Sequence, residues 1–199
     1  MICINPIINE TKNTYMAHIK LTNEELPGIL GLLHYSPKTA KPLNDLAEVL
    51  LTSDDNSLSK GEREIIAASV SHKNDCHFCH TIHASVAVAH FNGNVELIDE
   101  IKTGLHNTPV SAKLHALLNI AHHVQQGGKK VTEEDIKAAK VEGATDREIH
   151  DTVLIAAAFC MYNRYVDGLA TWAPQPKEAY LESGANLAKY GYAATTPVI

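Results

Sequence analysis

Apolar residues recur at three- and four-residue intervals along most of this chain, which is the period of a helix with one buried face. The pattern is clear over residues 42–51, where leucine and alanine occupy one face of the expected helix. No stretch of useful length alternates apolar and polar residues, as a half-buried strand would. The sequence therefore predicts an all-α fold.

Helix starts are marked by serine or threonine followed three residues later by an acidic residue, the pattern of a capping box. Four such pairs occur: Thr22–Glu25, Ser59–Glu62, Thr132–Asp135 and Thr145–Glu148. Glycine and proline provide the expected stops. The helices are expected over residues 22–33, 42–51, 59–71, 76–93, 95–105, 114–124, 132–143, 145–168 and 177–190, with a frayed tail over 193–199.

The chain has 199 residues, enough for one domain with a sizeable hydrophobic core. We expect a single domain over 1–199, with a core of about 25–172, an N-terminal extension over 1–21, and a C-terminal helix and tail over 177–199. Apolar residues make up 45% and charged residues 20%, which is ordinary for a soluble protein. A net charge of −6 offers no attraction for nucleic acid or an anionic membrane, so neither is an expected partner.

The first residues show neither the basic start nor the apolar run of a signal peptide or membrane span. A cytoplasmic location is therefore expected. In that compartment the four cysteines are expected to be thiols, ligands or catalysts rather than structural disulfides. Cys3 is interpreted as an incidental thiol near the terminus.

The chemically richest stretch is residues 64–83, which predicts two helices joined by a polar turn at 72–75. Asp75 is expected to cap the second helix, because its side chain accepts well from orphan amides. Cys76 and Cys79 then fall in the first turn, where the helix dipole favours negative charge. Both thiols are therefore expected to ionise more readily than a free thiol.

Two thiols at this spacing can cycle between dithiol and disulfide. A thiolate that attacks a peroxide becomes a sulfenic acid, which a neighbouring thiol condenses to a disulfide. His83 lies four residues after Cys79 on the same helical face, so Cys79 is the candidate attacking thiol and Cys76 the resolving thiol. An antiparallel hairpin would place Glu64 opposite His83, where a carboxylate would orient the imidazole as a base.

The same residues permit simpler interpretations. Glu64 could be an ordinary charge near a helix start, and His83 an ordinary histidine with its hydrogen bonds satisfied. Five histidines between His72 and His90 also raise the question of a metal site. Its ligands would be Cys76, Cys79, His80 and His83. One helical turn cannot wrap a tetrahedral ion, and structural zinc ligands usually come from two segments, so no metal is expected.

A shift of 84 residues superposes part of the chain on itself, which suggests an internal repeat. In this register Arg63, Glu64, Ile65, Cys76, Cys79 and His83 fall on Arg147, Glu148, Ile149, Cys160, Asn163 and Asp167. The repeat predicts a pseudo-symmetric pair of helical hairpins in which only the first copy keeps the chemistry. Glu148 is then expected to cap a helix, and Cys160 to lie in the core.

The spacing of Glu64, eleven residues, Cys76, two residues, Cys79, three residues and His83 resembles the motif of the AhpD-like alkylhydroperoxidases. These proteins belong to the carboxymuconolactone decarboxylase superfamily. The segments 58–84 and 131–170 are similar to its peroxidase-related branch. The resemblance covers roughly residues 25–172.

This resemblance implies an AhpD-like helical bundle that assembles as a homo-oligomer, often a trimer or hexamer, with a buried active site. It implies a thiol-dependent hydroperoxide reductase in which Cys79 is peroxidatic, Cys76 resolving, and Glu64 and His83 a proton relay. The expected substrate is a hydroperoxide, and the expected electron donor is a thiol or lipoyl-type reductant. No cofactor is expected beyond the redox-active Cys76–Cys79 disulfide.

One position departs from the family pattern. The best-studied members carry a histidine directly before the second cysteine, where this chain has Phe78. His77 lies one residue earlier and points about 100° away around a helix, so it need not replace that histidine. Weaker peroxidase activity is therefore one expectation, and a disulfide reductase or redox sensor remains the alternative function. Decarboxylase members lack the cysteine pair, which argues against lactone decarboxylation.

Overall fold

The structure is a computed structural model that describes residues 17–106 and 110–193. The expectations for Cys3 and for most of the N-terminal extension and of the tail concern residues outside these ranges.

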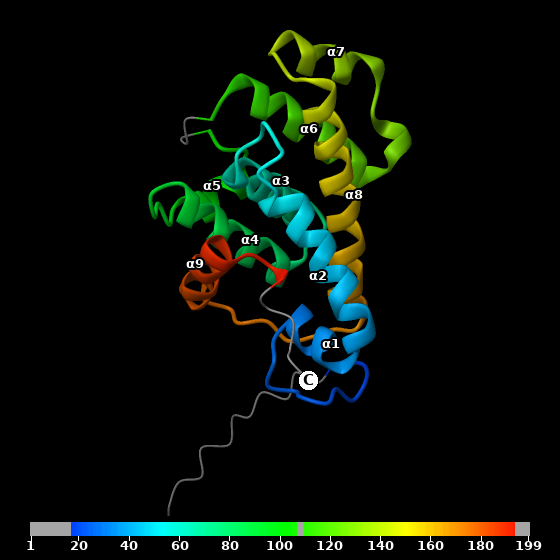
Figure 1. Ribbon diagram of the computed structural model, residues 1–199, viewed down its shortest axis with the longest axis vertical. Coiled ribbons are helices and arrows are strands. Elements are labelled where there is room, and N and C mark those ends of the chain that lie inside the picture. Colours follow the sequence, from blue (N-terminus) through cyan, green and yellow to red (C-terminus); the bar gives the residue numbers. More distant parts are fainter. Residues whose placement is uncertain (1–16, 107–109, 194–199) are drawn as a thin grey trace, which may run out of the picture.

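Every regular element among the described residues is helical, which confirms the all-α prediction. Figure 1 shows the helices as an elongated bundle, with α7 at one end and α1 at the other. The α-helices are α1 Ile29–Tyr35, α2 Pro37–Thr52, α3 Lys60–Lys73, α4 His77–His90, α5 Leu97–Thr103, α6 Ala112–Gln126, α7 Glu133–Val141, α8 Asp146–Gly168 and α9 Leu181–Tyr190. Two short 3₁₀ helices are η1 Gly128–Lys130 and η2 Lys177–Tyr180.

Three of the four predicted capping boxes are present, at the starts of α3, α7 and α8. In the box of α8, the Thr145 amide donates to Glu148 at 2.8 Å, and the Glu148 amide donates to the Thr145 hydroxyl at 3.1 Å. The box predicted at Thr22–Glu25 is wrong, because α1 begins only at Ile29. Gly28 has a φ of 53°, which interrupts any helix running into α1.

The prediction for α2 was too short at its N-terminal end. The helix begins at Pro37, where the missing amide of proline costs no hydrogen bond and its fixed φ suits a helix. It then continues through Pro42, the predicted start. Pro42 lies in the second turn, so the helix absorbs one lost backbone hydrogen bond there.

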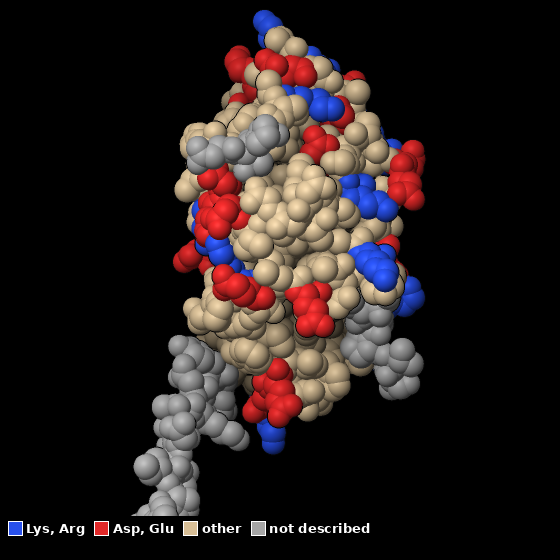
Figure 2. Space-filling view, turned by 90° about the vertical axis from the view of Figure 1, so that its left-hand side faces the viewer, with Lys and Arg blue, Asp and Glu red and all other residues tan. Residues whose placement is uncertain are grey.

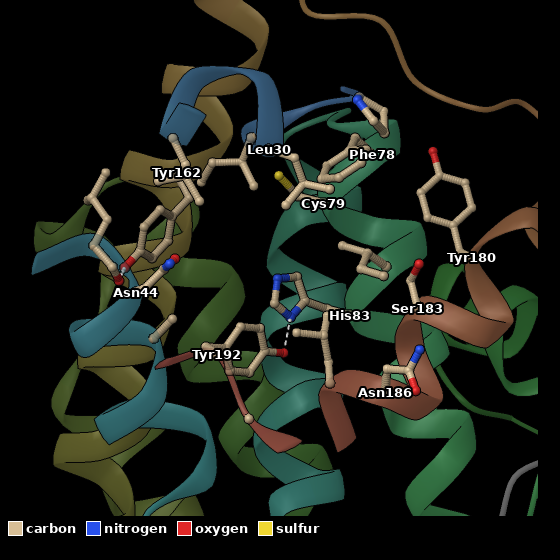
Figure 3. A pocket seen from close by; sticks show the side chains of 18 of the residues that line it. Leu30, Asn44, Phe78, Cys79, His83, Tyr162, Tyr180, Ser183, Asn186 and Tyr192 are labelled. Carbon is tan, nitrogen blue, oxygen red and sulfur yellow. Dashed lines mark hydrogen bonds between the residues drawn. The ribbon is translucent and has the colours of Figure 1, made fainter. Parts of the chain in front are cut away.

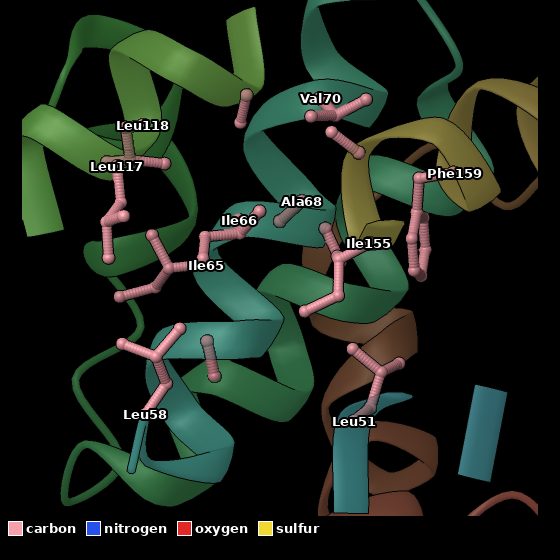
Figure 4. Packing of buried hydrophobic residues seen from close by; sticks show 14 of the residues in the cluster. Leu51, Leu58, Ile65, Ile66, Ala68, Val70, Leu117, Leu118, Ile155 and Phe159 are labelled. Atoms are coloured by element: carbon pink, nitrogen blue, oxygen red, sulfur yellow. The ribbon is translucent and has the colours of Figure 1, made fainter. Parts of the chain in front are cut away.

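Helix α3 is the centre of the bundle. It packs against α4 on one side and against α6 and α8 on the other, and α9 lies along α4 (Figure 1). Its residues from Arg63 to Ser71 are all buried, whichever way they face. Figure 4 shows Ile65 and Ile66 of α3 among core residues that include Leu117 of α6 and Ile155 of α8. A helix buried all round places Glu64 in the interior of the protein.

The approach of α9 to α4 is unusually close. A Cβ added at Gly184 would lie 2.6 Å from the Ser85 Cβ and 2.7 Å from its carbonyl carbon. Only glycine fits there without moving backbone. This contact holds the C-terminal end of the chain against the helix that carries the cysteines.

The prediction of two equivalent helical hairpins is wrong, because the second segment of the repeat has no turn where the first has one. The turn at 72–75 corresponds to residues 156–159, which lie inside the single continuous helix α8. The first segment reads His-Lys-Asn-Asp, whereas the second reads Ala-Ala-Ala-Phe. Alanine favours the helix interior and asparagine and aspartate favour turns, so only the first segment breaks.

The face in Figure 2 carries Lys, Arg, Asp and Glu side chains scattered around an uncharged middle. This face has no basic patch of the kind that binds nucleic acid. Among the helices of residues 17–106 and 110–193, none is long and apolar enough to cross a membrane.

Candidate active site

The cysteine turn joins α3 to α4, but its cap differs from the prediction. Asp75 has a φ of 61°, a left-handed conformation that aspartate tolerates better than most residues. The N-cap is instead Cys76, and its side chain makes no capping hydrogen bond. The prediction of Asp75 as N-cap is therefore wrong by one residue. Cys79 still lies in the first turn of α4, as expected.

Both cysteines are free thiols and are buried, with 1% of Cys76 and 3% of Cys79 exposed. The pKa of the Cys76 thiol is raised, first by its hydrogen bond with Cys79 and then by burial. The expectation that Cys76 ionises readily is therefore wrong for the reduced protein. Cys76 and Cys79 are thus neighbours in the folded protein, as disulfide closure requires.

Glu64 and His83 meet across the α3–α4 hairpin. His83 Nδ1 lies 2.8 Å from Glu64 Oε2, and both side chains are buried. A carboxylate only accepts hydrogen bonds, so Nδ1 carries the hydrogen and Nε2 is the basic nitrogen of the neutral ring. The hairpin thus brings together the two residues that sequence spacing had paired.

Tyr192 joins this pair and was missed by the sequence analysis. Its hydroxyl donates to Glu64 Oε1 at 2.7 Å and lies 3.2 Å from His83 Nδ1 (Figure 3). It lies 109 residues beyond His83, just after α9, and its neighbours show no motif that would have revealed it. Only the packing of α9 on α4 delivers it to the site.

A cavity of about 410 Å³ opens beside these residues (Figure 3). Cys79 and His83 lie one helical turn apart on α4, and both line it. Cys76 is not among the lining residues. Most of the wall is apolar and comes from α1, α2, α8 and α9, as illustrated by Leu30, Ala47, Phe159 and Leu187. The site therefore presents one thiol and one imidazole to an apolar chamber.

A second hollow of about 220 Å³ is polar and reaches Glu64 by another route. Glu48, Lys60 and His90 also line it. Glu64 thus borders this hollow, while His83 lines the apolar cavity.

Phe78 forms part of the apolar wall rather than a polar relay. Its ring packs edge to face against Tyr180, with centroids 5.8 Å apart, and lies so close to Gly28 that a Cβ there would sit 2.3 Å away. His77 Nε2 instead lies 2.9 Å from the Pro174 carbonyl oxygen. His77 therefore does not occupy the place of the family histidine.

The alternative zinc ligands are not assembled. His80 Nδ1 lies 3.0 Å from the Ala68 carbonyl oxygen, and its burial lowers its pKa to about 4. His83 faces Glu64. Within the described parts of the chain, no three His, Cys, Asp or Glu side chains are grouped to hold a metal ion.

The residues of the second copy serve mainly structural roles. Glu148 is the capping residue of α8, as expected, and also accepts from Lys113 Nζ at 2.7 Å. Asn163 is buried and links α8 to the cysteine turn, accepting from Asn74 at 2.8 Å. Cys160 is only partly buried. Burial raises the pKa of Asp167, while its hydrogen bond with Cys76 partly offsets this rise.

Residues 37–103 match the carboxymuconolactone decarboxylase family. This segment contains Glu64, both cysteines of the turn, and His83. No curated protein matches the chain.

Solved structures share the fold. An uncharacterised peroxidase-related protein from Silicibacter sp. TM1040 is 25% identical, with 78% of each chain covered and a TM-score of 0.67. An alkylhydroperoxidase AhpD core protein from Ralstonia eutropha JMP134, also peroxidase-related and uncharacterised, is 20% identical. It covers 85% of this chain and 97% of its own, with a TM-score of 0.71. A protein of unknown function from Agrobacterium tumefaciens is 19% identical, covering 73% and 97%, with a TM-score of 0.61.

Proposed function

We propose that this chain, whose residues 37–103 match the carboxymuconolactone decarboxylase family and whose fold is AhpD-like, is a thiol-dependent reductase of organic hydroperoxides. The observation that carries the proposal is the meeting of Cys79 and His83 at one apolar cavity, with Glu64 hydrogen-bonded behind the imidazole. A nucleophile, a base and a group that orients the base are the components of an activated thiol.

In the first step His83 Nε2 takes the proton of Cys79, directly or through one water. The Cys79 thiolate then attacks the terminal oxygen of the hydroperoxide. The S–O bond forms as the O–O bond breaks, so sulfur is oxidised to a sulfenic acid and the peroxide leaves as an alcohol after taking up a proton. The imidazolium formed on the way is stabilised by Glu64, which lies 2.8 Å from Nδ1.

In the second step Cys76 resolves the sulfenic acid. Its sulfur attacks the Cys79 sulfur, the S–S bond forms, and the sulfenic oxygen leaves as water with the proton of Cys76. Cys76 does not line the cavity, so it does not compete with Cys79 for peroxide. An external dithiol then reduces the disulfide and is itself oxidised.

The cavity favours a bulky apolar hydroperoxide over hydrogen peroxide. Its volume of about 410 Å³ is within the range of small-molecule sites. An alkyl or aryl group bound there would remove the apolar wall from contact with water, which favours binding. Cys79 lines the cavity and Cys76 does not, so the reductant must reach the disulfide through the cavity as well. A small dithiol or a lipoyl arm has the slender shape for this.

The direct test is stopped-flow oxidation of the reduced protein by cumene hydroperoxide and by hydrogen peroxide, with free thiols counted before and after. Rapid loss of two thiols is expected, abolished in Cys79→Ser and arrested as a sulfenic acid in Cys76→Ser. Cys160→Ser is the matched control and should lose two thiols at the normal rate.

Catalytic turnover separates this function from its alternatives. With a small dithiol present, a reductase consumes peroxide repeatedly, whereas a redox sensor oxidises once and stops. Slow oxidation that His83→Ala leaves unchanged would contradict the mechanism. Disulfide exchange with a protein partner would then be the function to pursue.

A further inference from the structure

The Tyr192 hydroxyl donates a hydrogen bond to the second oxygen of the Glu64 carboxylate. His83 Nδ1–H donates to Oε2 at 2.8 Å, and the Tyr192 hydroxyl donates to Oε1 at 2.7 Å. A carboxylate held at both oxygens has a fixed plane, and an imidazole bonded to it has a fixed ring orientation. The position of Nε2 in the cavity therefore depends on the tyrosine as well as on the carboxylate.

Ring contacts hold the imidazole from two further directions. The Tyr192 ring stacks over His83, with centroids 5.7 Å apart and an interplanar angle of 20°. Phe159 of α8 meets the same imidazole edge to face, with centroids 4.5 Å apart and an angle of 88°. The imidazole is thus confined by aromatic rings as well as by its hydrogen bond.

Glu48 of α2 fastens the segment that carries this tyrosine. Its Oε2 accepts the backbone amides of Tyr192 and of Ala193, the second at 3.0 Å. Burial raises the pKa of Glu48, but hydrogen bonds from Thr52, Ala193 and Tyr192 outweigh it, so the net pKa is lowered and the carboxylate stays charged. This contact is called the Glu48 latch below.

The chain turns into the latch through Gly191. This residue has a φ of 74°, and an added Cβ would lie 2.5 Å from Glu48 Oε2. Glycine therefore satisfies both the left-handed backbone and the close approach of the carboxylate. The end of α9, the glycine turn and the latch together deliver one side chain, Tyr192, into the interior, where 7% of it is exposed.

We propose that Tyr192, held by the Glu48 latch, is a positioning residue for the Glu64–His83 pair. The inference rests on the proposed function only for its kinetic consequence. Tyr192 does not touch the sulfur of Cys79 in this role. It keeps Glu64 aligned with Nδ1–H, so that the unprotonated Nε2 of His83 is the nitrogen available to Cys79.

The test compares the full-length protein with Tyr192→Phe, which retains the ring and loses only the hydroxyl. Oxidation of Cys79 by cumene hydroperoxide should slow by about 5- to 50-fold. The loss is partial because a positioned base contributes roughly 10²- to 10⁴-fold to a rate, and His83 itself remains in the variant. Tyr35→Phe, at an exposed tyrosine of α1, is the matched control and should react at the normal rate.

A second readout reports the geometry without reference to catalysis. In protein labelled with ¹⁵N-histidine, the Nδ1–H of His83 should give a proton signal protected from exchange with water. In Tyr192→Phe this proton should exchange at least tenfold faster, since the carboxylate that accepts it is no longer held at its other oxygen. A tyrosine that served only to fill space would leave the signal unchanged.

The outcomes separate this inference from the proposed function. If the natural protein reduces hydroperoxide and Tyr192→Phe matches it within twofold, or the His83 signal is unchanged, the inference is overturned and the function stands. If the natural protein reacts with no hydroperoxide, the function fails, and the exchange of the His83 proton alone decides the positioning role.

Glu48→Ala provides the same test if Tyr192→Phe does not fold. Removal of the carboxylate releases both backbone amides of the latch while the tyrosine side chain remains. Both the oxidation rate of Cys79 and the protection of the His83 proton from exchange should decrease, as in Tyr192→Phe. Retention of both in Glu48→Ala would show that the latch does not position the tyrosine.

Discussion

Glu64 and His83 lie on neighbouring antiparallel helices, and their side chains meet with Oε2 2.8 Å from Nδ1. The carboxylate is 1% exposed and the histidine 9%. A buried carboxylate is costly unless its oxygens are paired, and here the imidazole and the Tyr192 hydroxyl occupy one oxygen each. The same contact that satisfies Glu64 also sets the tautomer of the proposed base.

Replacement of Glu64 by glutamine should slow the oxidation of Cys79 by cumene hydroperoxide. Glutamine keeps the size but removes the charge that stabilises an imidazolium, so we expect a loss of about 10- to 10²-fold. The rate is measured by stopped flow under single-turnover conditions. Glu62→Gln on the same helix is the matched control, because glutamine preserves a capping box. Equal rates in both variants would remove Glu64 from the relay.

Ser183→Trp should change selectivity between peroxides. Ser183 is an exposed residue of α9 that points into the cavity (Figure 3), so a large ring there narrows the chamber without disturbing the core. Oxidation by cumene hydroperoxide should fall at least fivefold, while hydrogen peroxide should react as before.

The control for this prediction is Glu182→Trp, an exposed neighbour on α9 that does not line the cavity. It should leave both rates unaltered. If Ser183→Trp slows both peroxides equally, the cavity is not the route by which the organic group reaches Cys79.

Gly184→Ala should destabilise the protein. The new methyl group would lie 2.6 Å from the Ser85 Cβ, so α9 or α4 must shift. Overpacking of this kind costs about 1–3 kcal/mol of unfolding free energy. Urea denaturation measures it, with Gly168→Ala as the comparison, since no atom lies within 4 Å of a Cβ at that helical glycine. A Gly184→Ala protein as stable as Gly168→Ala would contradict the close contact.

The protein should lose stability as the pH falls from about 6.5 towards 4. Burial lowers the pKa of His80 to about 4, and that of His122 to about 4 for the same reason. In this pH range the unfolded chain binds protons that the folded protein does not, so each such histidine removes up to about 1.4 kcal/mol per pH unit. His122 is less buried, and solvent screening should reduce its share.

The check is the unfolding free energy measured at several pH values in the natural protein and in His80→Gln. The variant should show a shallower decline below pH of about 6.5, because one of the groups that take up protons on unfolding is gone. His106→Gln, at an exposed histidine, should retain the natural slope. An unchanged slope in His80→Gln would show that His80 is not held neutral.

The amino-acid sequence by itself determined the helical class, three of the helix starts, and the group of Glu64, Cys76, Cys79 and His83. These are local properties. Apolar spacing specifies a helical face, a serine or threonine with an acid three residues on closes its own capping box, and an i, i+4 pair lies on one face whatever surrounds it. Even the pairing of Glu64 with His83 needed only a short hairpin.

Only the tertiary structure decided the details that depend on distant segments. Gly28 and Asp75 take left-handed conformations that shift two predicted helix starts. The hydrogen bond with Cys79 and burial raise the pKa of Cys76, against the effect expected from the helix dipole. Tyr192 reaches Glu64 from 128 residues away, because Gly184 lets α9 lie against α4 and Glu48 holds the chain beyond it. Such contacts are set by packing, which no periodicity in the sequence records.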